Sequence, residues 1–213
     1  MSEFWEDSFR EKQTMWGFKP ADSAQITAKR FKYQGLTNIL IPGMGYGRNA
    51  KAFLDEGLTV TGIEISETAI GLAKEYLGEE VQVHHGPVDQ MPYDQQQYDG
   101  IFCYALIHLL DAPTRAKLIE DCYQQLKPGG SMVFLAISTK AFIYGDGREL
   151  GKHWYETPHG VRLYFYDAEG VQEAFGRYGL VEALEVLEPA KVKDQKPQHT
   201  FWQITCRKAS DLD

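Results

Sequence analysis

The 213-residue sequence contains few cysteines and no long apolar run. Cys103, Cys122 and Cys206 are scattered and show no CxxC spacing, so we expect neither a disulfide framework nor a zinc knuckle but a reduced, cytoplasmic protein. The longest apolar run, 101–110, is ten residues long, about half of the roughly 20 needed to cross a bilayer. The acidic, amphipathic beginning of the chain does not resemble a secretory signal. We therefore expect no membrane partner.

Basic residues are also scarce relative to acidic ones. Lysine and arginine number 22 against 30 aspartates and glutamates, which gives a formal net charge of −8. An acidic surface repels phosphate backbones, so we expect no nucleic-acid partner. We expect no metal centre either, because the adjacent His84 and His85 have no Asp, Cys or His partner at a suitable spacing. With 43% hydrophobic and 24% charged residues, the composition is that of one globular domain.

Short apolar runs alternate with helical segments along the chain. The runs suited to buried strands lie at 38–42, 59–63, 81–84, 100–104 and 131–137, and two more follow at about 180–187 and 200–206. Alternation of this kind predicts an α/β fold. We expect a Rossmann-like, doubly wound, mostly parallel seven-stranded sheet with helices on both faces and an antiparallel C-terminal edge strand.

Three alternate glycines follow the first predicted strand. Gly43, Gly45 and Gly47 allow positive φ and the close approach of a ligand to the backbone. A dinucleotide fingerprint, GxGxxG, would need glycine at position 48, where the sequence has Arg48. Glu64 ends the second predicted strand, where a carboxylate can accept both ribose hydroxyls of an adenosyl ligand. The pattern favours an adenosyl ligand without a pyrophosphate.

Several motifs resemble those of class I S-adenosylmethionine-dependent methyltransferases. Residues 39–47 resemble motif I of that family, 61–66 resemble motif II, and 125–130 match its LKPGG turn. Within the family, Gly47-Arg48-Asn49 and the aromatic N-terminal stretch are similar to the tellurite-resistance and thiopurine methyltransferase-like small-molecule group. Many members carry an acid two residues before the first glycine, and here that position is Ile41.

The resemblance implies S-adenosyl-L-methionine as the cofactor. It places Val88 and Asp89 in the loop that faces adenine, Cys103 and Tyr104 at the end of strand four beside the sulfonium, and Trp16 over the cofactor or substrate. The cofactor-binding residues implied are Gly43, Gly45, Gly47, Glu64, Ile65, Val88, Asp89, Cys103 and Trp16. The alternative for Trp16 is a core position that packs the first helix.

Two histidines are candidates for the acceptor side of the site. His108 begins the segment that covers the acceptor in the family, either as a base or acceptor-orienting group or as a buried structural histidine. His153 lies in a long aromatic loop, 138–166, which we expect to be a substrate lid rather than a packed insertion. The single domain 1–213 then consists of a helical N-terminal cap (1–35), a cofactor-binding core (36–137), the lid loop, and a C-terminal helix with strands (167–213).

The expected activity is methyl transfer to a small molecule by in-line displacement. A thiol, a metalloid anion, a heterocycle or a carboxylate would fit as the acceptor, and the sequence does not decide the oligomeric state. A protein that binds S-adenosylmethionine without catalysis remains an alternative. A nicotinamide-dependent oxidoreductase is a weaker one, because the glycine spacing and the LKPGG turn argue against it.

Overall fold

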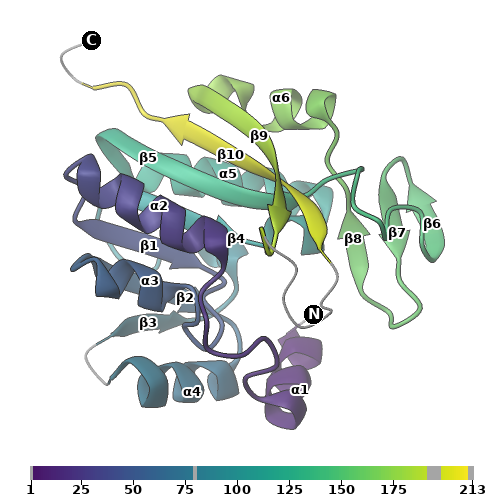
Figure 1. Ribbon diagram of the computed structural model, residues 1–213, viewed down its shortest axis with the longest axis horizontal. Helices are drawn as coiled ribbons and strands as arrows, with labels where there is room; N and C mark the ends of the chain where they lie inside the picture. The colour runs from purple at the N-terminus through teal and green to yellow at the C-terminus, as the bar shows by residue number, and fades with distance from the viewer. Residues whose placement is uncertain (1, 79–80, 191–197, 211–213) are drawn as a thin grey trace.

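A seven-stranded sheet forms the centre of the molecule. The computed structural model describes residues 2–78, 81–190 and 198–210. The strands follow the order β3-β2-β1-β4-β5-β10-β9, and the first five are mutually parallel (Figure 1). Their bounds are Asn38–Pro42 (β1), Thr59–Glu64 (β2), Gln82–His85 (β3), Tyr98–Tyr104 (β4), Leu126–Ile137 (β5), Leu180–Glu188 (β9) and His199–Arg207 (β10). The predicted α/β fold and mostly parallel sheet are confirmed.

The C-terminal strand β10 is antiparallel, as expected. It inserts between β5 and β9 and pairs antiparallel with both, so that β9 forms the edge of the sheet. This insertion brings residues near position 200 beside the end of β5. It therefore places a late part of the chain next to the ligand-binding edge of the parallel strands.

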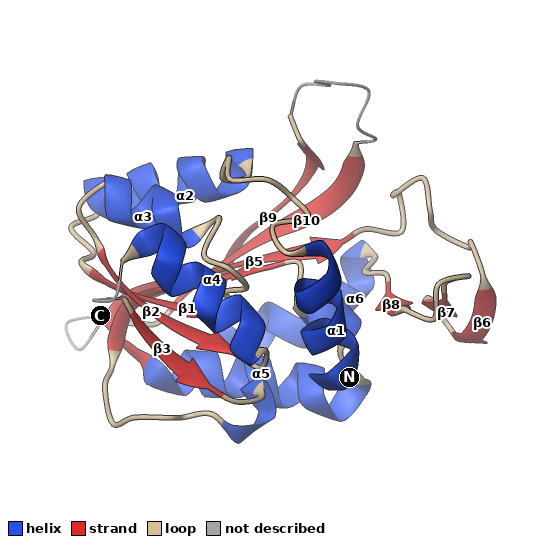
Figure 2. Cartoon of the chain, turned by 90° about the horizontal axis from the view of Figure 1, so that it is seen from below, coloured by secondary structure: helices blue, strands red, loops and turns tan. Residues whose placement is uncertain are grey.

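Helices cover both faces of the sheet. The helices are Ser2–Lys12 (α1), Asp22–Tyr33 (α2), Ala50–Asp55 (α3), Glu67–Leu77 (α4), Ala112–Gln125 (α5) and Ala168–Phe175 (α6), and the short 3₁₀ turns are Val88–Gln90 (η1), Ile107–Leu109 (η2) and Gly176–Tyr178 (η3). Ile39 and Ile41 of β1 pack in one core cluster with α2 and α3, whereas Leu40 packs in the other with α5 and α6. Figure 2 shows α2 and α3 on one side of the sheet and α5 on the other. Burial on both faces explains the unbroken apolar run of β1.

Side-chain caps begin α4, α5 and α6. The Ser66 hydroxyl accepts a hydrogen bond from Ala69 N–H (3.0 Å) at the start of α4. Asp111 accepts one from Thr114 N–H (2.9 Å) at the start of α5. Asp167 does the same for α6. These bonds satisfy amides that have no partner within the helix.

Strand β5 begins five residues earlier than predicted. The segment expected to be only a turn, 127–130, is drawn into the sheet by the chain that follows β10. Gly129 N–H donates to the carbonyls of Lys208 and Ala209, and Lys208 N–H donates to Gly130 O. The pairing is non-local, so the local turn signal does not reveal it.

The expected loop 138–166 forms a second sheet instead. Its antiparallel strands are Arg148–Gly151 (β6), Trp154–Glu156 (β7) and Arg162–Tyr164 (β8), at the right of Figure 1. Aromatic and β-branched side chains favour strands here, and Tyr144 packs edge-on against both Tyr155 and Phe165. The segment thus satisfies much of its own backbone.

The longest helix, α5, has 14 residues. Across the described residues, no helix combines the length and apolar character required to span a bilayer.

Candidate functional site

A cavity of about 1590 Å³ opens at the carboxyl ends of the parallel strands. This is the position at which open α/β sheets bind ligands. Its walls come from parts of the chain that are far apart in sequence: positions 5–29, 43–49, 63–65, 86–90, 104–114, 188–190 and 199–201. The cavity therefore joins the glycine loop to the C-terminal strands.

The glycines of the loop divide into two kinds. Gly43 and Gly45 line the cavity with φ of +66° and +58°, and a Cβ on Gly43 would lie 2.9 Å from Leu106 Cδ2. Gly47 does not line it. A Cβ there would lie 2.4 Å from Leu77 Cδ1, so Gly47 allows the loop to pack on α4. Two of the three predicted glycines lie at the cavity wall, and the third supports the loop from behind.

Glu64 links the glycine loop to the start of α4. Its Oε2 accepts a hydrogen bond from Gly45 N–H (2.8 Å), and its Oε1 accepts from Ile65 N–H (2.8 Å) and Ser66 N–H (3.0 Å). Burial raises the pKa of Glu64, whereas the three amides act in the opposite direction. A carboxylate has about four acceptor positions. The side chain lines the cavity and keeps capacity for a ligand hydroxyl.

Of the other cofactor-binding residues implied by the resemblance, some line the cavity and one does not. Ile65, Val88 and Asp89 line the cavity. Cys103 does not, because alternation along β4 turns it into the core on the α5 side while Tyr104 lines the cavity. Burial raises the pKa of the Cys103 thiol far above its usual range, so it is not a thiolate.

The segment after α1 is held by side chains of the glycine loop. Trp16 stacks on Tyr46 with ring centroids 6.2 Å apart and planes 10° apart, and Trp16 N–H donates to the Tyr46 hydroxyl (3.2 Å). Asn49 Oδ1 accepts from Ala21 N–H (2.9 Å). Trp16 lines the cavity although 45% of its surface is exposed. Trp16 also packs on Trp5 and Phe9 of α1, with ring centroids 6.4 and 6.0 Å apart, so both expected roles stay predictions.

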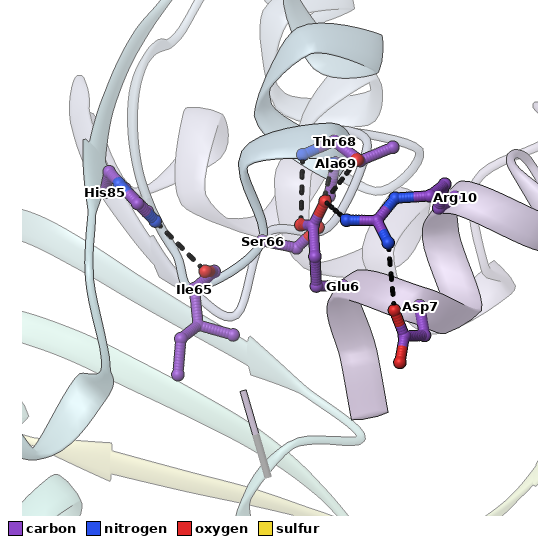
Figure 3. A network of polar contacts seen from close by, with 8 residues as sticks. All are labelled: Glu6, Asp7, Arg10, Ile65, Ser66, Thr68, Ala69 and His85. Atoms are coloured by element: carbon purple, nitrogen blue, oxygen red, sulfur yellow. Dashed lines mark hydrogen bonds and ion pairs between the residues drawn. The ribbon is translucent and has the colours of Figure 1, made fainter. Parts of the chain in front are cut away.

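Helix α1 is attached to α4 through Glu6, which sequence reasoning missed. Glu6 Oε2 accepts hydrogen bonds from Ser66 Oγ (2.6 Å) and Thr68 N–H (3.2 Å), and Arg10 lies 3.3 Å from Oε1 (Figure 3). The hydroxyls of Ser66 and Thr68 lower the pKa of Glu6 to about 2. Ser66 thus contacts both Glu6 and Glu64. An acid near a helix N-terminus is favourable, but sequence spacing does not bring residue 6 to α4.

His108 lines another part of the cavity, on η2. Its Nδ1 accepts a hydrogen bond from Ile137 N–H (3.2 Å) at the end of β5. Burial lowers the pKa of His108 to about 3. The ring is 6.0 Å from that of Phe201 on β10. The imidazole is therefore neutral and fixed by the sheet.

Aromatic side chains surround His108 in this part of the cavity. Tyr104 stacks near Phe201 with centroids 6.0 Å apart, and burial raises the pKa of Tyr104 to about 12. Arg48 Cζ lies 5.9 Å from the centre of the Tyr104 ring. His199 contacts the edge of Phe201 at 6.4 Å. The sequence gives no local signal for His199 or Phe201, because only the insertion of β10 brings them here.

His153 lies outside the cavity. The Tyr144 hydroxyl is 2.7 Å from its Nδ1, and Asp167 Oδ2 is 3.1 Å from its Nε2. Both ring nitrogens thus have protein partners, and the geometry gives no support to the expected catalytic role. Among the described lining residues none falls within 138–166, so this segment is not seen to cover the cavity.

The second sheet instead packs, from outside the cavity, against the segment that carries His108. Strand β8 packs against η2, and the Arg115 guanidinium lies 3.8 Å from the centre of the Tyr164 ring and 5.3 Å from that of Trp154. Arg115 also donates to Leu110 O (2.7 Å). Within the described part of the chain, no group of three or more His, Cys, Asp or Glu side chains could hold a metal ion.

Comparison with known proteins adds sequence relatives and fold neighbours. A methyltransferase domain model matches residues 39–130. A ubiquinone biosynthesis O-methyltransferase of Coxiella burnetii is 30% identical over 130 residues, covering 56% of this chain and 55% of that protein. A protein of the same name from Aromatoleum aromaticum is 29% identical over 112 residues, covering 50% of this chain and 47% of that protein. The chain thus spans about half the length of the curated relatives it matches.

Solved structures agree with the fold over nearly the whole chain. The 1,6-didemethyltoxoflavin-N1-methyltransferase of Burkholderia thailandensis gives a TM-score of 0.72 at 18% identity, covering 98% of this chain and 87% of that one. TehB from Haemophilus influenzae gives 0.65 at 17% identity, covering 96% and 67%. The matched domain contains the glycine loop, Glu64 and the strands that position them. Residues 39–130 therefore match a methyltransferase domain, and nearly the whole chain has the fold of solved methyltransferases.

Proposed function

We propose that this protein transfers a methyl group from S-adenosylmethionine to a small, flat acceptor. The observation that carries the proposal is the continuity of one cavity. Gly43, Gly45 and Glu64 line one end of it, and His108 and Phe201 line the other. A ligand at the first end and an acceptor at the second would share one continuous cavity, as methyl transfer requires.

The residues of the first end suit an adenosyl ligand. Gly43 and Gly45 line the cavity without side chains, and Glu64 keeps acceptor capacity for a ribose hydroxyl. Val88 and Asp89 would contact the adenine, and Trp16 would cover the ligand. The bound cofactor supplies an electrophilic methyl group. The protein then has to orient the acceptor and exclude water.

The residues of the second end suit an aromatic or heteroaromatic acceptor. Tyr104 and Phe201 offer ring surfaces, and Arg48 adds a positive charge beside them. The relatives above are named as O-methyltransferases and a fold neighbour as an N1-methyltransferase. We therefore place phenols and nitrogen heterocycles first among the acceptors, followed by thiols, metalloid anions and carboxylates.

A turnover screen tests the proposal. Purified protein is incubated with S-adenosylmethionine and each acceptor class, and the release of S-adenosylhomocysteine is measured above the acceptor-free rate. We expect release with at least one flat aromatic acceptor. Binding of S-adenosylhomocysteine by calorimetry without release on any panel would indicate a silent binder. Binding of NAD in place of S-adenosylhomocysteine would instead support an oxidoreductase.

A further inference from the structure

The protonation pattern of His108 follows from its hydrogen bond to the backbone. Ile137 N–H can only donate, so the Nδ1 atom that it meets at 3.2 Å must carry a lone pair. A neutral imidazole has one N–H and one acceptor nitrogen. With Nδ1 as the acceptor, the proton of His108 resides on Nε2.

The surroundings of the ring maintain this neutral form. His108 is 5% exposed, and burial lowers its pKa to about 3. His199 of β10 is the charge-bearing neighbour that adds to this shift, and the pKa of His199 is itself lowered by burial. A second proton on Nδ1 would also meet the N–H of Ile137. The tautomer is thus determined by the sheet as well as by burial.

The Nε2 atom is directed to space that a ligand can occupy. Nε2 forms no hydrogen bond with any other described residue. Three buried side-chain polar atoms of the described residues have no partner, and Nε2 of His108 is not one of them, whereas Nδ1 of His199 is. Nε2 is therefore accessible from the cavity. The residue lines the cavity. His108 therefore presents an N–H donor, and no lone pair, to the acceptor end.

We propose that His108 is a fixed hydrogen-bond donor that orients an oxygen atom of the methyl acceptor, rather than a general base. The inference rests on the proposed function and narrows its substrate class. The acceptor is a flat molecule that places an ionised hydroxyl, or a carbonyl oxygen beside the nucleophilic atom, against His108. The rings of Tyr104 and Phe201 lie beside His108 and offer apolar surface against which such a molecule can rest.

The proton balance follows from the same geometry. A lone pair of the acceptor atom forms the bond to the methyl carbon, the carbon–sulfur bond breaks, and its electron pair stays on sulfur. The proton of an acceptor hydroxyl has left to water before the transfer, because His108 offers no lone pair to take it. An acceptor that ionises readily in water is therefore favoured over an aliphatic alcohol.

The tautomer is tested directly by NMR. Protein labelled with ¹⁵N-histidine is examined by long-range ¹H–¹⁵N correlation at pH 7, and His108→Leu assigns the signals. We expect an unprotonated Nδ1 and a protonated Nε2 for His108. The opposite tautomer, or an imidazolium at this pH, would overturn the proposal. This readout does not depend on cofactor or turnover.

The donor role is tested with 4-nitrophenolate, a flat oxyanion whose binding is followed by visible absorbance. The protein is saturated with S-adenosylhomocysteine, and wild type is compared with His108→Leu and His108→Gln. We expect His108→Leu to weaken binding about 10- to 100-fold, the range for losing one hydrogen bond to a charged group. Glutamine supplies an N–H but no useful base, so His108→Gln should retain most of the affinity.

Three outcomes contradict the assignment: equal binding to wild type and His108→Leu, equal losses in both variants, or no binding of 4-nitrophenolate to wild type that has bound S-adenosylhomocysteine. Failure of wild type to bind S-adenosylhomocysteine would overturn the proposed function instead. Calorimetry on each variant separates the two cases.

Discussion

Two aromatic-rich segments, 2–21 and 138–166, lie outside the central sheet and have different relations to the cavity. The first contributes Trp5, Phe9 and Trp16 to the cavity wall. The second contributes no described residue to that wall, and it packs its aromatic side chains against one another and against Arg115. The sequence predicts a helical cap for the first and a substrate lid for the second.

The difference lies in where each segment satisfies its polar groups. Segment 2–21 bonds to the ligand-binding elements, through Glu6 to Ser66 and through Trp16 to Tyr46. Segment 138–166 pairs its backbone within its own sheet. A segment that forms its own strands needs no contact with the glycine loop. Aromatic content therefore identifies an ordered insertion, whereas polar contacts decide whether it lies at the cavity wall.

The largest effect is expected for Arg115→Ala, which removes the side chain that segment 138–166 packs against. The variant loses a buried charged hydrogen bond to Leu110 O and the stacking on Tyr164. We expect the free energy of unfolding in urea to fall by about 2–4 kcal/mol. Affinity for S-adenosylhomocysteine should stay within calorimetric error. Arg115→Lys keeps the charge without the flat guanidinium, so its free energy of unfolding should lie between those of wild type and Arg115→Ala. A loss of affinity at unchanged stability would reverse the roles of the segments.

The next largest effect is expected on cofactor affinity, at Glu64 beside the elements that segment 2–21 contacts. Glu64→Ala should weaken S-adenosylmethionine binding by about 1 to 3 kcal/mol, because a charged hydrogen-bonded contact is removed. Calorimetry measures this, with Glu64→Gln as the shape-matched control. Circular dichroism shows whether each variant is folded. Unchanged affinity of a folded Glu64→Ala protein would refute the ribose assignment.

A smaller, pH-dependent effect is expected for Glu6. Its pKa is lowered from 4.5 to about 2 in the folded protein, so its stabilisation of the docked α1 is complete above about pH 4.5. That stabilisation is lost as the pH falls from 4.5 towards 2. Fluorotryptophan NMR can follow Trp5 and Trp16 of this segment separately from Trp154. Glu6→Gln should expose Trp5 and Trp16 at neutral pH and leave Trp154 unchanged. Movement of all three signals together would show that the segments are not independent.

The smallest effect is expected for Arg162→Ala on β8. The Arg162 side chain is 61% exposed and shares Glu156 with Arg148. Exposed ion pairs of this kind contribute little, so the urea midpoint should not change measurably. A clear decrease would mean that surface charges, and not Arg115, hold the second sheet in place.

Much of the sheet could be predicted from local sequence, because its signals lie within a few residues. The run 38–42, the caps Ser66 and Asp111, and Glu64 at the end of β2 are of this kind. The pairing of 127–130 with the chain after β10 was missed, because it joins residues about 80 positions apart.

The cavity likewise contains residues that local sequence predicts and residues that only tertiary packing brings there. The glycine loop and Glu64 follow from spacing, whereas strand alternation places Tyr104 at the cavity wall and Cys103 in the core. Phe201 reaches the cavity only because β10 inserts beside β5. Glu6 reaches α4 only because α1 folds back on it. These contacts depend on tertiary packing, which local patterns do not encode.

The two outer walls of the cavity lie outside the stretch shared with the methyltransferase domain, 39–130. One wall comes from positions 5–29 and the other from 188–190 and 199–201. Mutational drift in those short stretches can reshape what the cavity accepts without disturbing β1, β2 or the glycine loop. A library designed to reshape the cavity without touching β1, β2 or the glycine loop would therefore diversify positions 5–29, 188–190 and 199–201.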